Sequence, residues 1–118
     1  MSNAIVWCDI PVKDLDRAVK FYGDLLGQPV AKEAFGEIKF GLLPHVNESV
    51  GGCLVLDGQP SADGPMLYLN CNQRLDAALA TVATNGGKVL QPKHQIGPHG
   101  FRAVVLDSEG NRIALHSK

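Results

Sequence analysis

The chain repeats itself with an offset of 60 residues. Leu15, Asp16, Ala18 and Gly27 recur as Leu75, Asp76, Ala78 and Gly87, and Val19 corresponds to the apolar Leu79. Two amphipathic helices can share such residues by chance, so the order of the elements around each helix has to agree as well. Both halves show one strand, one helix and then three strands, which predicts two copies of a βαβββ unit.

The first copy begins with residues 5–12, which are rich in β-branched and aromatic side chains and form a predicted strand. Asp14 is placed to cap a helix whose apolar residues recur every three or four positions, and Gly27 to end it. Three further strands are predicted at residues 29–32, 37–42 and 52–56.

A connector at residues 59–65, crowded with Pro, Asp and Gly, separates the two halves. After it we predict a strand at 66–70, a helix that begins near Leu75 and is closed by Gly86 and Gly87, and strands at 88–91, 101–106 and 112–116. The sequence therefore predicts a single α+β domain over residues 1–118, with module one at about 4–58 and module two at about 65–118. Each module has one apolar sheet face to cover, so a pocket between the modules is the expected binding site.

Composition excludes several classes of partner. The 118 residues carry a net charge of -1, and no cluster of Lys and Arg accompanies the few aromatic residues, so we expect no nucleic acid partner. No apolar stretch approaches the ~18 residues of a membrane span, and no signal peptide pattern is visible. Three scattered cysteines argue against a disulfide framework, which favours a cytoplasmic protein.

Three motifs carry a resemblance to a known family. They are residues 9–18 leading to Phe21-Tyr22 and Leu26-Gly27, residues 75–79 followed by 86–89, and residues 107–113. In this order and spacing they resemble the vicinal oxygen chelate superfamily, which includes glyoxalase I, bleomycin-resistance proteins and extradiol dioxygenases. Residues 92–101 and 115–117 resemble a glyoxalase-related bacterial subgroup more narrowly. The resemblance implies two βαβββ modules that form curved mixed sheets around a cavity, in a homodimer.

The resemblance also implies a divalent metal held by His and Glu side chains from four strands. The four corresponding places in this chain are Trp7, residues 51–54 with Cys53 as the one coordinating side chain, Met66 or Leu67, and Ala114. Catalytic metal sites keep three or more oxygen, imidazole or thiolate ligands from the protein. We therefore expect no family-type metal and no glutathione-dependent glyoxalase chemistry, although a metal bound elsewhere stays open.

Two residues beside the expected metal positions are candidates for chemistry. Strand alternation places Asp9 on the face of Trp7 and His116 on the face of Ala114. An Asp and a His at a cavity can bind a polar ligand or transfer a proton, which makes Asp9 and His116 the catalytic candidates. The alternative is an ion pair near the chain end without a functional role.

Other residues are candidates for the pocket lining. Trp7 and Tyr68 would supply aromatic walls, Met66 is more typical of a core position, and Arg102 would either pair with an anionic ligand or face solvent. A loop bounded by Pro and Gly carries Lys93, His94 and His99, which would either contact a ligand or form a solvated turn. The three cysteines have no sequence-local activating partner, so we interpret them as small buried hydrophobes.

These observations favour a protein that binds a small organic molecule between its modules without the superfamily's metal and assembles as a homodimer. Two other interpretations stay open at this point. One is a lyase, isomerase or dioxygenase-like enzyme that uses Asp9 and His116 or an unforeseen metal. The other is an accessory or regulatory subunit whose exposed sheet docks a partner.

Overall fold

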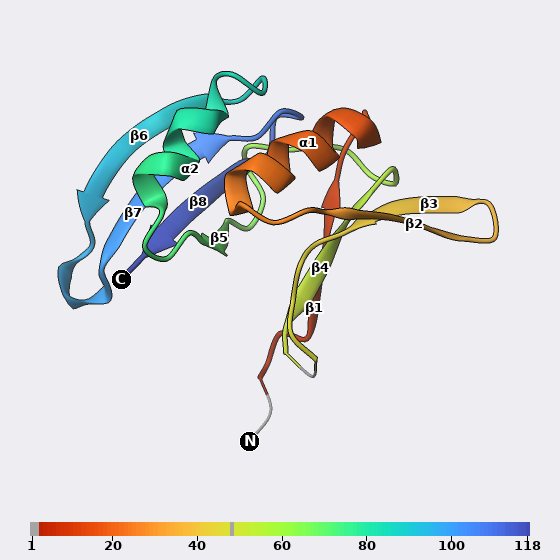
Figure 1. Cartoon of the computed structure of the whole chain (residues 1–118), viewed down its shortest axis with the longest axis horizontal. Helices are drawn as coiled ribbons and strands as arrows, with labels where there is room; N and C mark the ends of the chain where they lie inside the picture. Colours follow the sequence, from red (N-terminus) through yellow and green to blue (C-terminus); the bar gives the residue numbers. More distant parts are fainter. Residues whose placement is uncertain (1–2, 48) are drawn as a thin grey trace.

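Two consecutive βαβββ units make up the part of the chain that the computed structural model describes, residues 3–47 and 49–118. Figure 1 shows the two units with their helices next to each other. The first unit consists of β1 (Trp7–Pro11), α1 (Leu15–Leu26), β2 (Ala31–Phe35), β3 (Ile38–Leu42) and β4 (Gly51–Val55). The second consists of β5 (Leu67–Asn70), α2 (Leu75–Val82), β6 (Lys88–Gln95), β7 (Phe101–Leu106) and β8 (Arg112–Ser117), with a 3-10 turn at Gly97–His99. The prediction of a repeated βαβββ order is confirmed.

Each unit forms a four-stranded mixed sheet, and the two sheets have the same strand order. The orders are β1-β4-β3-β2 and β5-β8-β7-β6. In each sheet the first and last strands of the unit pair in parallel, and the remaining pairs are antiparallel. The helix between the first and second strands crosses one face of the sheet, and it leaves the other face free of helices (Figure 1).

The two helices begin at equivalent residues but differ in length. Asp14 caps α1, because its Oδ1 accepts the N–H of Arg17 at 3.0 Å, and Gly27 ends it in the left-handed region at φ 69°. In α2 the cap position is Arg74, which makes no side-chain capping bond, and regular helix ends at Val82. The helix therefore stops before Gly86 and Gly87, where the sequence predicted its end. The segment between contains Thr84 and Asn85, which have lower helix propensity than Ala or Leu.

Strand β6 also differs from the prediction. It continues to Gln95 through Pro92, so Lys93 and His94 lie in a strand rather than in the predicted loop, and only His99 lies in a turn. Its pairing with β7 shifts register between Val89 and Gln91 and again before His94. Such irregularities allow an edge strand to contain a proline, which has no N–H to donate.

The hydrophobic core lies between the helices and one face of both sheets. It contains Phe21, Tyr22 and Leu25 from α1, with Leu75, Ala78 and Val82 from α2, all nearly inaccessible to solvent. The strands add Ile10, Val12, Leu54, Val105, Ile113 and Leu115. Because side chains alternate along a strand, the neighbours of these residues face away from the helices.

The turn between β7 and β8 joins module two to the start of α1 in module one. The fully buried Glu109 carboxylate accepts the backbone N–H groups of Lys13 and Asp14 at 2.9 and 3.0 Å. It also pairs with Arg17, whose Nε lies 2.7 Å from Oε2. This turn therefore fixes one module against the other.

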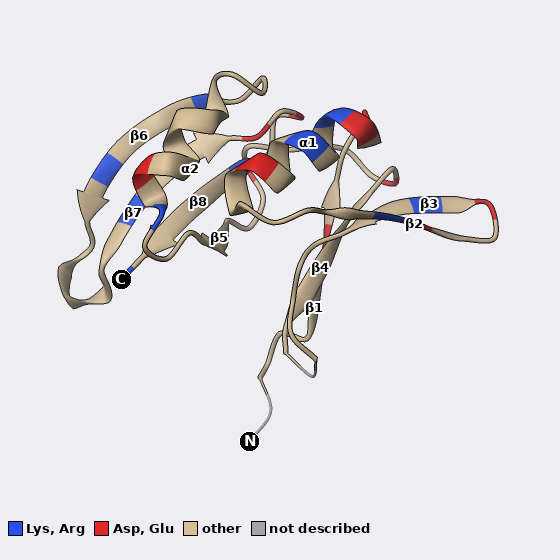
Figure 2. Ribbon diagram, viewed as in Figure 1, with Lys and Arg blue, Asp and Glu red and all other residues tan. Residues whose placement is uncertain are grey.

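Charged residues are concentrated on the outer elements. Figure 2 shows them mainly on the helices, the β2–β3 hairpin and β6, while β4 carries none. In the described part of the chain, neither helix is long and apolar enough to cross a membrane.

Candidate functional site

The predicted site residues of β1 and β8 lie on the faces that the helices do not cover. In β1, Ile10 enters the core, so Asp9 and Trp7 face the opposite side. In β8, Ile113 and Leu115 enter the core, so Arg112, Ala114 and His116 face away from it.

A pocket of about 280 Å³ lies where the two modules meet. Its lining comes from β1, the connector, β5 and β8, and includes Asp9, Pro11, Ser61, Leu67, Asn111 and Arg112. It combines apolar walls with a few polar side chains, which is typical of small-molecule sites. The connector and the three strands thus bring residues that are far apart in the sequence together around one pocket.

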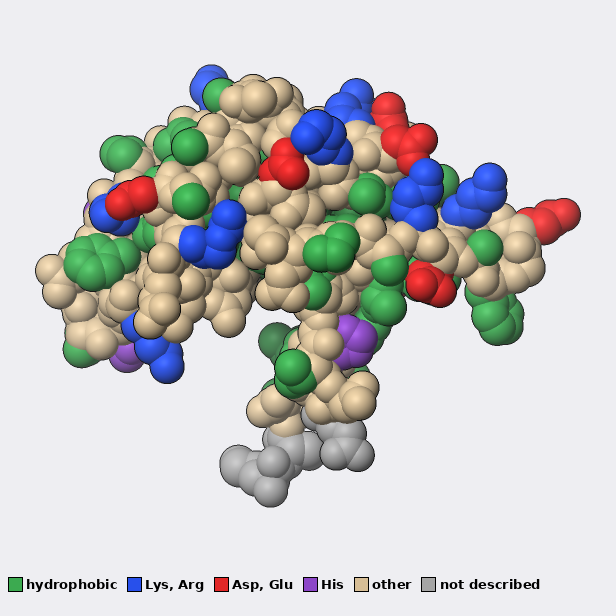
Figure 3. All heavy atoms as spheres, viewed as in Figure 1, with side chains coloured by type: hydrophobic (Ala, Val, Ile, Leu, Met, Phe, Trp, Pro, Cys, Tyr) green, Lys and Arg blue, Asp and Glu red, His purple; other side chains and the backbone are tan. Residues whose placement is uncertain are grey.

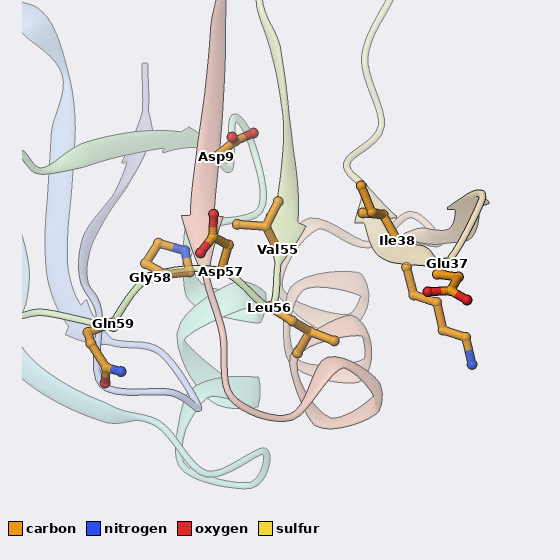
Figure 4. Close-up of a pocket in the computed structure, with 10 residues that line it drawn as sticks. Asp9, Glu37, Ile38, Val55, Leu56, Asp57, Gly58 and Gln59 are labelled. Atoms are coloured by element: carbon orange, nitrogen blue, oxygen red, sulfur yellow. The ribbon is translucent and has the colours of Figure 1, made fainter.

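A larger hollow of about 780 Å³ continues from this pocket over module one. The two spaces share Asp9, Pro11 and Gln59, and the smaller one is the more enclosed. Figure 4 shows Asp9 and Asp57 on one side of the larger hollow and Glu37, from the β2–β3 hairpin, across it. Asp9 therefore lies at the junction of the larger acidic hollow and the smaller intermodule pocket.

The side chain of Asn111 holds the wall of the intermodule pocket in place. Its Nδ2 donates to the carbonyl of Pro11 at 2.8 Å and to Asp107 Oδ2 at 3.0 Å, and its Oδ1 accepts the N–H of Ser61 at 3.0 Å. Asn111 is buried, so all three bonds are shielded from water. The sequence placed this residue in a turn, but it gave no sign of its contacts with β1 and the connector.

Arg112 is the pocket residue that sequence reasoning missed. Its Nε atom is buried and has no hydrogen-bond partner in residues 3–47 and 49–118. Its backbone N–H donates to the carbonyl of Ser61 at 3.3 Å, which fixes the start of β8 against the connector. In the sequence it is one charged residue after a turn, and only the fold shows that its Nε is buried while the residue as a whole is partly exposed.

Asp9 interacts with a neighbouring thiol. The Sγ of Cys53, its partner on β4, donates to Asp9 Oδ1 at 3.2 Å. Burial, together with this bond, raises the pKa of the Cys53 thiol, and burial with the nearby Asp9 charge raises the pKa of Cys8. Both cysteines therefore stay protonated at neutral pH, which is the opposite of an activated nucleophile.

Five of the predicted pocket residues come together on the sheet of module two. Arg102 donates from a terminal nitrogen to the hydroxyl of Tyr68 at 2.7 Å and from Nε to Nε2 of His94 at 3.2 Å. The Tyr68 and His116 rings are tilted relative to each other, with their centroids 6.4 Å apart. The Nε2 atom of His116 lies 2.6 Å from the carbonyl oxygen of His99. Arg102 is thus held by an imidazole and a phenol hydroxyl, without a carboxylate partner among the described residues.

Lys93 and Trp7 do not join this cluster. Lys93 pairs with Asp76 on the first turn of α2 at 3.1 Å, as Lys32 pairs with Asp16 in module one. Trp7 packs edge-on against His45, with ring centroids 5.8 Å apart. The repeated Lys–Asp pair connects a strand to its helix in each module.

The two catalytic candidates have separate partners. Asp9 accepts from Cys53, and His116 bonds to the backbone of His99. No hydrogen bond or ion pair joins Asp9 to His116 among the described residues, so the structure does not present them as a proton-transfer pair.

The residues at the superfamily's metal positions do not fit a divalent ion. Trp7 pairs with Gly51, and a Cβ atom at Gly51 would lie 3.0 Å from the Trp7 ring, so the two residues pack closely and neither supplies a side-chain ligand for a metal. Leu67 packs against the core, and its neighbour Tyr68 pairs with Ala114. The described residues contain no group of three His, Cys, Asp or Glu side chains that could hold a metal.

A fold of two βαβββ modules with a pocket between them defines a class of protein that comparison with known proteins identifies. Residues 4–115 match the model of the Glyoxalase/Bleomycin resistance protein/Dioxygenase superfamily. A glyoxylase-like domain-containing protein from Didymella fabae is 31% identical over 98% of this chain and 94% of its own length.

Solved structures agree on the fold. A glyoxalase/bleomycin resistance protein from Albidiferax ferrireducens superposes with a TM-score of 0.76 at 20% identity, covering 98% of this chain and 99% of that one. A glyoxalase-related enzyme from Fulvimarina pelagi gives 0.70 at 18% identity, covering 98% and 88%. The chain belongs to the glyoxalase/bleomycin resistance/dioxygenase superfamily.

Proposed function

We propose that this protein binds a small organic molecule in the pocket between its modules, without the metal of its superfamily. The observation that carries the proposal is the pocket of about 280 Å³ between β1, the connector and β8, with a wall that Asn111 fixes through three hydrogen bonds. Pockets that bind small ligands are mostly apolar, formed before binding and provided with a few polar groups. Here Pro11 and Leu67 supply apolar surface, and Asp9 and Arg112 supply charge.

A fragment screen followed by protein NMR tests this function. Fragments of varied charge should shift the amide signals of residues around the pocket, such as Ser61 and Leu67. Gly64 offers a matched pair of variants, because it lines the pocket and nothing lies within 4 Å of a Cβ atom added there. Gly64→Trp adds a bulky side chain to the pocket lining and should abolish the shifts, while Gly64→Ala should retain them. Fragments that bind only elsewhere, or equally well to Gly64→Trp, would overturn the proposal.

The metal-free part of the proposal rests on the donor set. Trp7 offers no metal ligand on β1, and Ala114 offers none on β8. Elemental analysis of protein purified without chelator should find no stoichiometric transition metal. One equivalent of Zn, Ni, Mn or Fe would overturn this part and return metal-assisted catalysis to consideration.

We further propose that the functional unit is a homodimer. Phe35 and Ile38 pair across the β2–β3 hairpin, and their exposed fractions are 78% and 65%. Figure 3 shows apolar side chains exposed on the part of the molecule formed by the β2–β3 hairpin. The helix-free face of module one carries Glu33 on β2, whereas that of module two carries Arg102 on β7, so these faces of two copies are complementary in charge.

Light scattering coupled to size-exclusion chromatography tests the dimer. The wild-type chain should have twice the mass of one chain, and Phe35→Ser with Ile38→Ser should shift it toward the monomer. Val89→Ser, which removes an exposed apolar residue from module two, is the control and should remain a dimer. A monomer at every concentration of the wild-type chain would contradict the proposal.

A further inference from the structure

Among the side chains of residues 3–47 and 49–118, the Nε of Arg112 is the one buried polar atom that has no hydrogen-bond partner. Its neighbour Asn111 has a hydrogen-bond partner for both side-chain heavy atoms, and so does the buried Asp107. Arg112 Nε is enclosed without any partner in the described chain. A buried donor without a partner is costly and therefore uncommon in folded proteins, so its retention points to a partner from outside the chain.

The charge of Arg112 is also unpaired within the described residues. The ion pairs there involve Arg17, Lys20, Lys32 and Lys93, all on the outer surface of the molecule or at the start of α1. Asp9 lines the same pocket, but no ion pair joins it to Arg112 in this part of the chain. The pocket therefore presents a guanidinium without a carboxylate from the protein.

The chemistry of the remaining lining limits what this guanidinium can bind. A guanidinium matches a carboxylate through two parallel hydrogen bonds. Pro11, Pro65, Leu67 and Ile113 line the same pocket with apolar surface, and the volume of about 280 Å³ admits only a small molecule. The negative charge of Asp9 in the same pocket disfavours a second anionic group on the ligand.

We propose that Arg112 binds the carboxylate of a small, otherwise apolar monocarboxylic acid in the intermodule pocket. This assignment rests on the proposed function, because it names the chemical class of the ligand for the same pocket. Arg112 recognises the carboxylate, the prolines and Leu67 contact the apolar body, and Asp9 discriminates against dicarboxylates.

Three probes built on one benzene ring test the assignment: benzoate, its neutral amide benzamide, and the dicarboxylate isophthalate. In NMR titrations of the wild-type protein, benzoate should bind about tenfold more tightly than either of the others. Arg112→Met keeps an unbranched stem and removes the charge, so the preference for benzoate over benzamide should disappear. Arg112→Lys should retain part of it, because an ammonium cannot form the bidentate pair.

Arg102→Met is the matched control, because Arg102 lies on the same sheet face but outside the pocket lining. It should leave the preference for benzoate unchanged. Loss of the preference in Arg102→Met, or its persistence in Arg112→Met, would overturn the assignment. Circular dichroism melts establish that each variant is folded, and Arg112→Lys decides the test if Arg112→Met does not fold.

The titrations also separate the two proposals. Benzamide binding in the pocket as tightly as benzoate would overturn the role of Arg112 and leave small-molecule binding supported. If no probe or screening fragment shifts the pocket signals, both proposals fail.

Discussion

The hydroxyl of Tyr22 donates a 2.5 Å hydrogen bond to Oδ2 of Asp107, and this bond joins α1 of module one to the β7–β8 turn of module two. Both residues are buried. Oδ1 of Asp107 accepts the backbone N–H groups of Glu109 and Asn111 at 2.8 and 2.9 Å. The aspartate of the third sequence motif is therefore an intermodule tie, and its neighbour Asn111 extends that tie to the pocket wall.

Removing the Tyr22 hydroxyl should destabilise the whole chain. Burial, followed by the Asp107 charge, raises the pKa of Tyr22 well above its usual value, so the phenol is a proton donor at every pH of interest. Tyr22→Phe leaves the Asp107 carboxylate buried with one donor fewer, which should lower the free energy of unfolding by about 1–3 kcal/mol in urea titrations. Tyr68→Phe, at a half-exposed site, should change it by less than about 0.5 kcal/mol. Equal effects would show that the Tyr22 bond is not an intermodule tie.

Stability should fall in acid because of Glu109. Burial by itself would raise the pKa of this carboxyl, but hydrogen bonds from Arg17, Asp14, Ser108 and Lys13 outweigh burial and lower the pKa to about 2. The folded state therefore binds a proton less readily than the unfolded chain, whose pKa is near the ordinary 4.5. The stabilisation is complete above that value and is lost as pH falls from about 4.5 to about 2.

Thermal melts across this pH range test the acid dependence. Glu109→Gln should melt at a lower temperature than wild type at pH 7, and its melting temperature should fall less between pH 5 and pH 3. Asp63→Asn, in the exposed connector, is the control and should follow the wild-type curve. If the melting temperatures of Glu109→Gln and wild type fell in parallel with pH, the Glu109 carboxyl would be ruled out as the source of the acid sensitivity.

Gly87 should tolerate no side chain. A Cβ atom there would lie 2.5 Å from the Leu106 carbonyl oxygen, 2.8 Å from the Phe21 ring and 2.9 Å from a Val82 methyl. Gly87→Ala should therefore destabilise the fold by about 1–3 kcal/mol or more, as judged by chemical denaturation. Gly64→Ala, where nothing lies within 4 Å, should be close to neutral. A neutral Gly87→Ala would mean that the Gly87 segment does not lie as close to β7 and α1 as described.

Cys71 should be unreactive in the native protein. Its thiol is fully buried, and burial raises its pKa to about 11, although the Arg74 charge acts slightly against this. At pH 8 iodoacetamide should modify Cys71 only after denaturation, which peptide mass spectrometry can measure. Cys8, which is partly exposed, should be modified first. Rapid native labelling of Cys71 would indicate local opening of the segment between β5 and α2.

Local signals in the sequence predicted the elements where those signals are strong. Asp14 and Gly27 set both ends of α1, because a cap and a left-handed glycine act within a few residues. The predictions were less accurate where pairing partners decide the outcome. Strand β2 was expected at residues 29–32 and lies at Ala31–Phe35, since its register is set by β3 and the turn at Gly36.

The candidate site also separates into features that the local sequence predicts and features that pairing partners decide. Alternation within one strand correctly put Asp9 beside Trp7 and His116 beside Ala114, since it needs no information from other strands. It did not separate Lys93 from His94, which face different partners although they are adjacent in the sequence. Pairing of β6 with β7 and of Lys93 with Asp76 decides that difference.

The sequence by itself determined the repeated βαβββ order, the family and the missing metal ligands at the positions of its motifs, because each depends on residue type and spacing along the chain. Only the tertiary structure decided that Asn111 frames a pocket and that the Nε of Arg112 is enclosed there without a partner. Burial is set by chain segments 50 to 100 residues apart, such as Ser61 and Pro11 around Asn111. No pattern of neighbouring residues specifies such an arrangement, because the free energy of a buried charge depends on every group that surrounds it in space.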